Sequence, residues 1–337
     1  MKKWQKIWGS LLLATLLVLA GCGSNNAAVE QNQGSNTNTP AAQEQNAGTN
    51  AGSEQAAAQT EYPLTVQDSS GQEFTFESAP QKIVSLAPSD TEVLFALGLD
   101  EQIVGVSDLD DYPEAVKDKP RMGTSKVNVE AVVAAQPDLV VTASFINEAT
   151  VKSLGDLGIK VFQSEPKTIQ DAIDHIKLIG TITDHQAQAE EVVAKMEQEL
   201  QMVTEAVKSV SDDQKKKVYI EFSPGWTVGK GEFMDEMITL AGGLNVASDI
   251  EGWSEINEEN IIQADPDVIL YAKSLVYENN QTLADIIKAR GGWDQIKAIK
   301  EDQVFGLEDN LLSRPGPRIT QGLIEVAKAI YPDLVQP

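Results

Sequence analysis

The chain has 337 residues, and its 51 Asp and Glu residues outnumber its 26 Lys and Arg residues, which gives a formal net charge of −25. Such a charge excludes nucleic acid and anionic lipid as partners held by a general electrostatic field of the protein. Cys22 is the single cysteine. The sequence therefore also excludes internal disulfides, and it excludes cysteine-based metal sites or nucleophiles from the rest of the chain.

Residues 1–21 are typical of a targeting segment. Three lysines (Lys2, Lys3 and Lys6) precede an apolar stretch, residues 11–20, that is too short to span a bilayer. The stretch ends in Leu-Ala-Gly-Cys, which resembles a bacterial lipobox, so we predict a lipoprotein signal peptide over 1–21 and lipidation of Cys22. An ordinary secretory signal with an incidental cysteine is the alternative. Two or more acyl chains would anchor the protein to the extracytoplasmic face of the cell membrane.

Residues 22–60 have a different composition from the rest of the chain. They are rich in Asn, Gln, Ala, Gly, Ser and Thr, and they contain no Lys or Arg. Such a segment buries too little apolar surface to offset the entropy lost on ordering. We predict a disordered, lipid-anchored tether.

Residues 61–168 are predicted to form an N-terminal α/β lobe. Apolar and polar residues alternate between Tyr62 and Glu77 around a Ser-Ser-Gly turn, which predicts a β-hairpin. Strands then alternate with helices: strand 83–88, helix 91–97, strand 103–106, a helix and strand over 128–141, helix 151–157 and strand 159–162. This alternation predicts a mostly parallel sheet covered by helices.

Residues 169–212 are predicted to be a helical linker. Apolar residues recur there at steps of three and four, which is typical of one buried helix face: Val192, Val193, Met196, Leu200, Val203, Val207 and Val210. Asp184 can cap this helix, which would run for about 40 Å to Val210. The chain's two histidines, His175 and His185, fall in the same segment and are expected to be exposed.

Residues 213–337 are predicted to form a C-terminal α/β lobe. Its elements, in order, are strand 218–222, a Gly-rich loop, helix 234–241, a helix and strand over 257–270, helix 283–288, strand 304–305 and helix 319–330.

A repeat links the two lobes. The segment NVEAVVAAQPDLVV begins at Asn128, and the segment NEENIIQADPDVIL begins at Asn257, with an offset of 257 − 128 = 129. Each copy has an Asn that can cap a helix, a Glu two residues later, a Pro-Asp break and an apolar strand. We therefore predict an α/β fold of two similar lobes with mostly parallel sheets, joined by one long backbone helix, with a ligand cleft between the lobes.

Several segments together resemble the helical-backbone class of solute-binding proteins of ABC importers, which carries cobalamin, ferric siderophores and haem. The resemblance extends from about residue 62 to 332 and rests on IVSLAPSDTEVLFALG (83–98), DYPEA (111–115), both repeat copies, LGIKV (157–161) and RPGPRI (314–319). The segments GWSEINEEN (252–260) and DYP are most similar to cobalamin-binding proteins. In this family one Glu on each lobe meets an Arg of the membrane permease, and the matching positions are Glu130 and Glu259.

The carboxyl ends of the predicted strands indicate where a ligand would bind. They place ten residues at the cleft: Ser89, Asp90, Thr124, Ser125 and Phe145 from the first lobe, and Phe222, Trp226, Trp253, Asn310 and Arg314 from the second. Trp253 matches a pocket Trp of the cobalamin-binding family. That family has more aromatic residues on the first lobe, where this chain has Leu109, Thr124 or Ser125, and Ser144. The departure leaves room for a ferric siderophore or another corrinoid.

Other functions have less support. Two histidines ten residues apart predict no metal site, and Tyr112 is a weak candidate for a haem ligand. The sequence has no nucleophile elbow, P-loop or HExxH motif, so we expect no enzyme, no catalytic residues and no resident cofactor. A surface sensor on the same fold remains an alternative. The prediction is a monomeric extracytoplasmic lipoprotein that delivers a metal chelate, with cobalamin as the first candidate, to an ABC permease dimer and its ATPase subunits.

Overall fold

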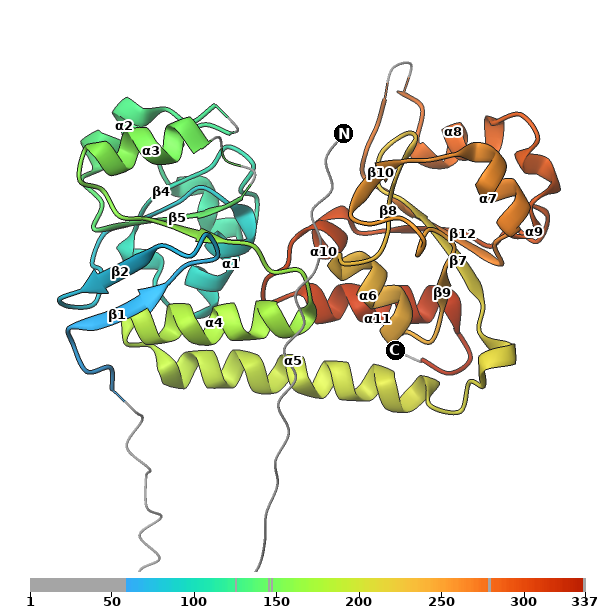
Figure 1. Ribbon diagram of the computed structural model, residues 1–337, viewed down its shortest axis with the longest axis horizontal. Coiled ribbons are helices and arrows are strands. Elements are labelled where there is room, and N and C mark those ends of the chain that lie inside the picture. Colours follow the sequence, from blue (N-terminus) through green and yellow to red (C-terminus); the bar gives the residue numbers. More distant parts are fainter. Residues whose placement is uncertain (1–58, 125, 145, 147, 278–279, 336–337) are drawn as a thin grey trace, which may run out of the picture. The chain divides into compact units, whose positions relative to one another are not determined.

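The predicted β-hairpin precedes a four-stranded parallel sheet in the N-terminal half of the chain (Figure 1). The computed structural model describes residues 59–337 except 125, 145, 147, 278–279 and 336–337, all within one compact unit. The signal peptide, Cys22 and nearly all of the predicted tether lie outside the described residues. None of the helices in the described ranges has the length and apolarity needed to cross a bilayer.

The N-terminal lobe is built on a sheet of strand order β4-β3-β5-β6. Its elements are β1 (Leu64–Gln67), β2 (Glu73–Phe76), β3 (Ile83–Ser85), α1 (Pro88–Ala96), η1 (Asp100–Gln102), β4 (Ile103–Val106), η2 (Glu114–Asp118), α2 (Val129–Ala135), β5 (Leu139–Ala143), α3 (Glu148–Asp156) and β6 (Val161–Ser164). The predicted strand 83–88 is too long, because Pro88 already occupies the first turn of α1.

The C-terminal lobe repeats this arrangement with strand order β12-β11-β7-β9, again parallel throughout. Its elements are η3 (Asp212–Gln214), β7 (Lys217–Glu221), β8 (Trp226–Val228), α6 (Phe233–Leu240), β9 (Leu244–Asn245), β10 (Trp253–Glu255), α7 (Glu258–Ala264), β11 (Val268–Ala272), α8 (Leu283–Ala289), η5 (Trp293–Gln295), α9 (Lys297–Lys300), β12 (Val304–Leu307), α10 (Asp309–Ser313) and α11 (Ile319–Ile330). Both sheets have the predicted parallel character.

The sequence repeat is also a structural repeat. The side chains of Asn128 and Asn257 cap α2 and α7, and both helices end at a residue in the left-handed conformation, Gln136 (φ 51°) and Asp265 (φ 49°). The strands that follow, β5 and β11, are central in their sheets and nearly fully buried. The second helical residue is Glu130 in one copy and Glu259 in the other, so the two carboxylates occupy equivalent positions.

One long helix, α5 (Gln186–Val207), connects the lobes, as predicted (Figure 1). The predicted helix from Asp184 to Val210 corresponds to α5, and a separate helix, α4 (Ile169–Thr183), which was not predicted as an element of its own within the helical linker, precedes it. Asp184 ends α4 in the left-handed conformation (φ 60°), and His185 occupies the N-cap of α5. The expectation that Asp184 caps the long helix is therefore wrong, since its backbone is already used to end the preceding one.

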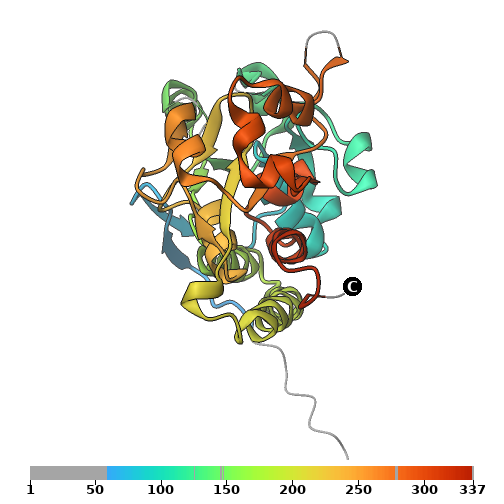
Figure 2. The same ribbon diagram turned by 90° about the vertical axis from the view of Figure 1, so that its right-hand side faces the viewer.

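The predicted apolar face of α5 joins both lobes to one core. It packs against α4 and α1 over one part of its length and against α11 over the other, and Figures 1 and 2 both place α11 beside α5. Its buried residues belong to a single apolar cluster that also contains Leu94 of α1 and Leu323 of α11. Movement of one lobe against the other must therefore preserve or repack this shared core.

Candidate functional site

A cavity of about 550 Å³ lies between the carboxyl ends of the two sheets. Its N-terminal wall follows β3, β5 and β6, and its C-terminal wall follows β7 and β12, as expected for ligand sites of parallel sheets. The lining residues are Pro88, Ser89, Leu109, Ala143, Ser144, Ser164, Glu165, Pro166 and Lys167 from the first lobe, and Phe222, Glu232, Phe233, Trp253, Asn310, Ser313, Arg314 and Pro315 from the second. We call this cavity the cleft.

The C-terminal wall of the cleft is aromatic. Phe222 and Trp253 meet edge to face, with ring centroids 5.6 Å apart and an interplanar angle of 83°. Trp253 stands on β10, which pairs antiparallel with β8, and 41% of this residue is exposed. Gly225 takes φ 78° in the turn between β7 and β8, a left-handed conformation that favours glycine. An exposed indole supported by a second ring can stack against a flat ligand.

The opposite wall is polar and carries little aromatic surface among its described residues. Ser89 and Ser144 place hydroxyl groups at the cleft, and Leu109 is 52% exposed there. This wall can donate hydrogen bonds to a ligand while the opposite wall supplies apolar contact.

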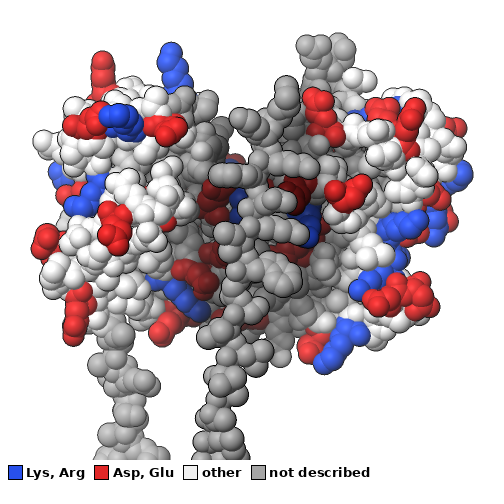
Figure 3. Space-filling view, in the orientation of Figure 1, with Lys and Arg blue, Asp and Glu red and all other residues white. Residues whose placement is uncertain are grey.

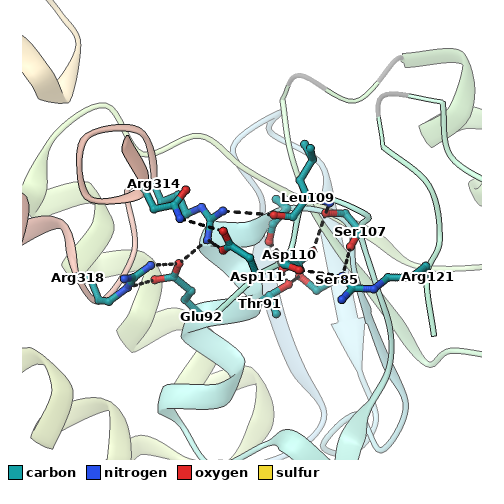
Figure 4. A network of polar contacts seen from close by, with 12 residues as sticks. Ser85, Thr91, Glu92, Ser107, Leu109, Asp110, Asp111, Arg121, Arg314 and Arg318 are labelled. Carbon is teal, nitrogen blue, oxygen red and sulfur yellow. Dashed lines mark hydrogen bonds and ion pairs between the residues drawn. The ribbon is translucent and has the colours of Figure 1, made fainter. Parts of the chain in front are cut away.

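Arg314 connects the two walls instead of projecting freely into the cleft (Figure 4). Its Nη1 donates to Asp111 Oδ1 at 2.7 Å and to Glu92 Oε1 at 3.0 Å, and its Nη2 donates to the Leu109 carbonyl at 3.3 Å. Asn310 also donates to Asp111, at 3.0 Å. Burial works against ionisation, but the hydrogen bond and charge of Arg314 lower the pKa of the Asp111 carboxyl.

Arg318 completes this cluster. It donates from Nε and Nη2 to the buried Glu92 carboxylate at 2.8 and 2.6 Å, and its guanidinium lies 3.9 Å from the ring centroid of Tyr112. Although burial opposes it, the Glu92 carboxylate raises the pKa of Arg318 above its ordinary value. Two carboxylates of the N-terminal lobe, Glu92 and Asp111, therefore bind two guanidiniums of the C-terminal lobe.

A second ion cluster connects the lobes at the cleft. Lys167 Nζ lies 3.0 Å from Glu232 Oε1, on the other lobe, and 3.1 Å from Glu165 Oε1. Although burial has the opposite effect, the two carboxylates raise the pKa of the Lys167 ammonium. Sequence reasoning missed all three residues, because it did not consider the end of β6 or the start of α6 as part of the site.

Five of the ten predicted ligand-binding residues line the cleft, namely Ser89, Phe222, Trp253, Asn310 and Arg314. Thr124 is half-buried in the loop before α2, and Trp226 is 41% exposed on β8, but neither is among the lining residues. Ser125 and Phe145 lie outside the described residues. The predicted docking residues Glu130 and Glu259 are both exposed.

Asp90 is buried below the cleft and not part of its wall. Its carboxylate accepts a hydrogen bond from Ser164 Oγ at 3.0 Å and lies 2.6 Å from His175 Nε2. The expectation that His175 is exposed is wrong, because only 10% of its side chain is accessible. It lies three residues after Ala172 and four before Ile179, so it belongs to the buried face of α4. His185 is likewise half-buried.

Asp110 has a pH-dependent effect on stability that can be tested. Its Oδ2 accepts from Ser107 at 2.6 Å, its Oδ1 has no hydrogen-bond partner within the described part of the chain, and burial raises the pKa of its carboxyl. An acid whose pKa is raised on folding stabilises the protein below its unfolded pKa and loses that contribution as the pH rises through the folded value.

We therefore expect wild type to lose stability relative to Asp110→Asn as the pH rises above the ordinary pKa of an aspartate carboxyl, because the raised pKa of Asp110 makes its ionisation costly in the folded protein. Urea unfolding of both proteins at each pH measures the difference. Asp108→Asn, at an exposed position, is the control. A difference between Asp110→Asn and wild type that does not vary with pH would contradict the expectation.

The family model described as "Periplasmic binding protein" matches residues 83–311, a range that contains both sheets and α4 and α5. The chain belongs to this family. Members are non-enzymatic solute-binding proteins, as the sequence predicted.

Two curated relatives cover most of the chain. The uncharacterized ABC transporter substrate-binding lipoprotein YvrC of Bacillus subtilis is 35% identical over 99% of both chains. A cobalamin-binding protein of Halobacterium salinarum is 30% identical over 80% of this chain and 74% of its own length. The predicted resemblance to this class, and to cobalamin-binding proteins within it, is confirmed.

A solved structure has the same fold. It is named as a possible iron-binding, periplasmic solute-binding protein of Staphylococcus epidermidis, and it is 33% identical with a TM-score of 0.65. The match covers 75% of this chain and 100% of the other. The predicted fold of two α/β lobes with parallel sheets is thereby confirmed.

Proposed function

We propose that this protein is the substrate-binding component of an ABC importer, and that it captures a bulky metal chelate, a corrinoid first, in the cleft. The observation that carries the proposal is the pair formed by Phe222 and the exposed Trp253, opposite a wall of serine hydroxyls. A corrin ring offers a broad apolar face with amide groups at its edge. Aromatic support on one side and hydroxyls on the other suit that combination.

The relatives support the class of ligand and divide on its identity. The Halobacterium salinarum relative is named for cobalamin, whereas the Staphylococcus epidermidis structure is named for iron. A ferric siderophore is therefore the second candidate. Haem has less support. Tyr112, the candidate haem ligand, lines a separate cavity with Phe95 and Val192, and the guanidinium of Arg318 lies over its ring.

The partner and location follow from the same proposal. Glu130 and Glu259 start equivalent helices of the two lobes, so they are suited to meet two equivalent subunits of a permease dimer. Lipidation of Cys22 would hold the protein on the extracytoplasmic face of the membrane, as the lipoprotein name of the Bacillus subtilis relative also suggests.

Replacement of Trp253 by Ala tests the ligand site. We expect the dissociation constant for cyanocobalamin to rise about tenfold to a hundredfold, since aromatic residues central to a binding site contribute about 2 kcal/mol. Equilibrium dialysis measures the constant without reliance on tryptophan fluorescence. Leu157→Ala, at a residue that is 58% exposed after α3 and away from the cleft, is the control.

An unchanged dissociation constant for Trp253→Ala would remove Trp253 from the site. Parallel measurements with a ferric siderophore separate the two candidate ligands. Binding of the siderophore alone would keep the transport assignment and replace the corrinoid. If neither ligand bound at any accessible concentration, the proposed class of ligand would be wrong.

A further inference from the structure

We infer that the cleft selects neutral or cationic chelates and rejects polyanionic ones, because each basic side chain that lines it is already neutralised by the protein's own carboxylates. The inference rests on the proposed function and narrows its class of ligand. It concerns the charge of the chelate, which neither the aromatic wall nor the relatives determine.

Arg314, the first of the two basic residues of the cleft, is held by acceptors of the N-terminal lobe. Its Nη1 is shared between Glu92 and Asp111, at 3.0 and 2.7 Å, and its Nη2 faces the Leu109 carbonyl. Only 11% of its side chain is exposed. With Arg318 on the same Glu92, this cluster holds two guanidiniums and two carboxylates. A ligand anion at Arg314 would therefore compete with two protein carboxylates for the same guanidinium.

Lys167, the second basic residue, faces more negative charge than it carries. Glu232 and Glu165 lie 3.0 and 3.1 Å from its Nζ, and both carboxylates line the cleft. The Glu232 side chain is only 9% exposed. This cluster therefore leaves one negative charge in excess at the cleft.

The remaining described residues of the lining are uncharged. Ser125, Phe145 and Asn147, which lie outside the described residues, are uncharged types as well. On the face shown in Figure 3, acidic side chains are spread over both lobes. The net charge of the chain, −25, adds a repulsion for anions at longer range.

The effect of the two ion clusters on ligand binding depends on the charge of the chelate and not on its size. A trianionic ferric tris-catecholate would meet the excess negative charge in a partly desolvated cavity, where charges interact more strongly than in water. A neutral ferric tris-hydroxamate or an amide-rimmed corrinoid would leave both ion clusters intact. Its polar edge could still accept hydrogen bonds from Ser89 and Ser144.

Two pairs of probes, each with a neutral and an anionic member, test the inference with the full-length protein. The probes are cyanocobalamin, which is neutral, and its monocarboxylate, in which one peripheral amide is hydrolysed. A neutral tris-hydroxamate and a trianionic tris-catecholate of iron form the second pair. We expect the neutral member of at least one pair to bind, and to bind about tenfold or more tightly than its anionic counterpart at low salt.

Two variants connect the selectivity to the residues. Glu232→Gln and Glu165→Gln each leave Lys167 with one carboxylate. Each variant is therefore expected to reduce the ratio of the dissociation constants of the anionic and the neutral probe. Glu165 is the more exposed of the two (43% against 9%), so its variant remains informative if Glu232→Gln does not fold. Glu301→Gln, at an exposed position before β12, is the matched control.

Three outcomes would overturn the inference. Equal or tighter binding of the anionic member would overturn the charge selectivity and leave the proposed function standing. If Glu232→Gln and Glu165→Gln both leave the ratio of the two dissociation constants unchanged, the selectivity does not come from these carboxylates. A failure of all four probes to bind wild type would overturn the proposed function, and the charge selectivity with it.

Discussion

Cells that carry the combined substitutions Glu130→Ala and Glu259→Ala are expected to lose ligand uptake, while the purified variant keeps the dissociation constant of wild type. Both residues are exposed, and each is the second residue of a helix that starts at an Asn cap. An exposed carboxylate is a charge that a permease can contact without any change in the cleft. Uptake of labelled ligand by cells and equilibrium dialysis on the purified protein are the two measurements.

The control for this double variant replaces two other exposed carboxylates, Glu101 and Glu301. They precede β4 and β12, and so lie at the amino ends of the sheets, whereas Glu130 and Glu259 lie toward the carboxyl ends. The control carries the same change in net charge and is expected to transport normally. Normal uptake by the Glu130 and Glu259 variant would contradict the docking role of the pair.

Local signals explain which parts of the fold could be predicted. The repeat was readable because each copy combines a capping Asn, a short apolar helix, a Pro-Asp break and an apolar strand, which are effects within a few residues. The apolar stripe of α5 was readable for the same reason, since its period identifies the buried face. The role of Asp184 was wrong because an Asp serves equally well as a start or an end signal for a helix: Asp184 ends α4, and His185 occupies the N-cap of α5.

The cleft depends on contacts that no local signal reports. Arg314 pairs with Asp111 across 203 residues and with Glu92 across 222 residues. Lys167 and Glu232 are 65 residues apart. Strand ends predicted that Trp253 and Arg314 lie near the site, because parallel sheets gather those ends at one edge. The strand ends could not predict that Arg314 pairs with protein carboxylates. They also could not predict that aromatic side chains, and not Arg314, provide the free surface of the C-terminal wall.

Glu92→Gln is expected to lower the free energy of unfolding by about 3 kcal/mol, since removal of one partner from a buried ion cluster leaves the opposite charges uncompensated. Glu92 lies on α1 with 2% of its side chain exposed, and it accepts hydrogen bonds from both Arg314 and Arg318. Glutamine keeps the size of the side chain and one acceptor but removes the charge. Arg314 keeps its ion pair with Asp111, whereas Arg318 loses its ion pair with Glu92.

Urea unfolding at neutral pH measures the loss, and Glu191→Gln, at an exposed position of α5, is the control. The double variant Glu92→Gln with Arg318→Gln should be less destabilised than the sum of the two single variants, because the second change removes the unpaired charge that the first one left. A loss for Glu92→Gln no larger than that of the control would mean that the apolar core shared by α1, α5 and α11 holds the lobes together, and that the ion cluster only orients Arg314 at the cleft.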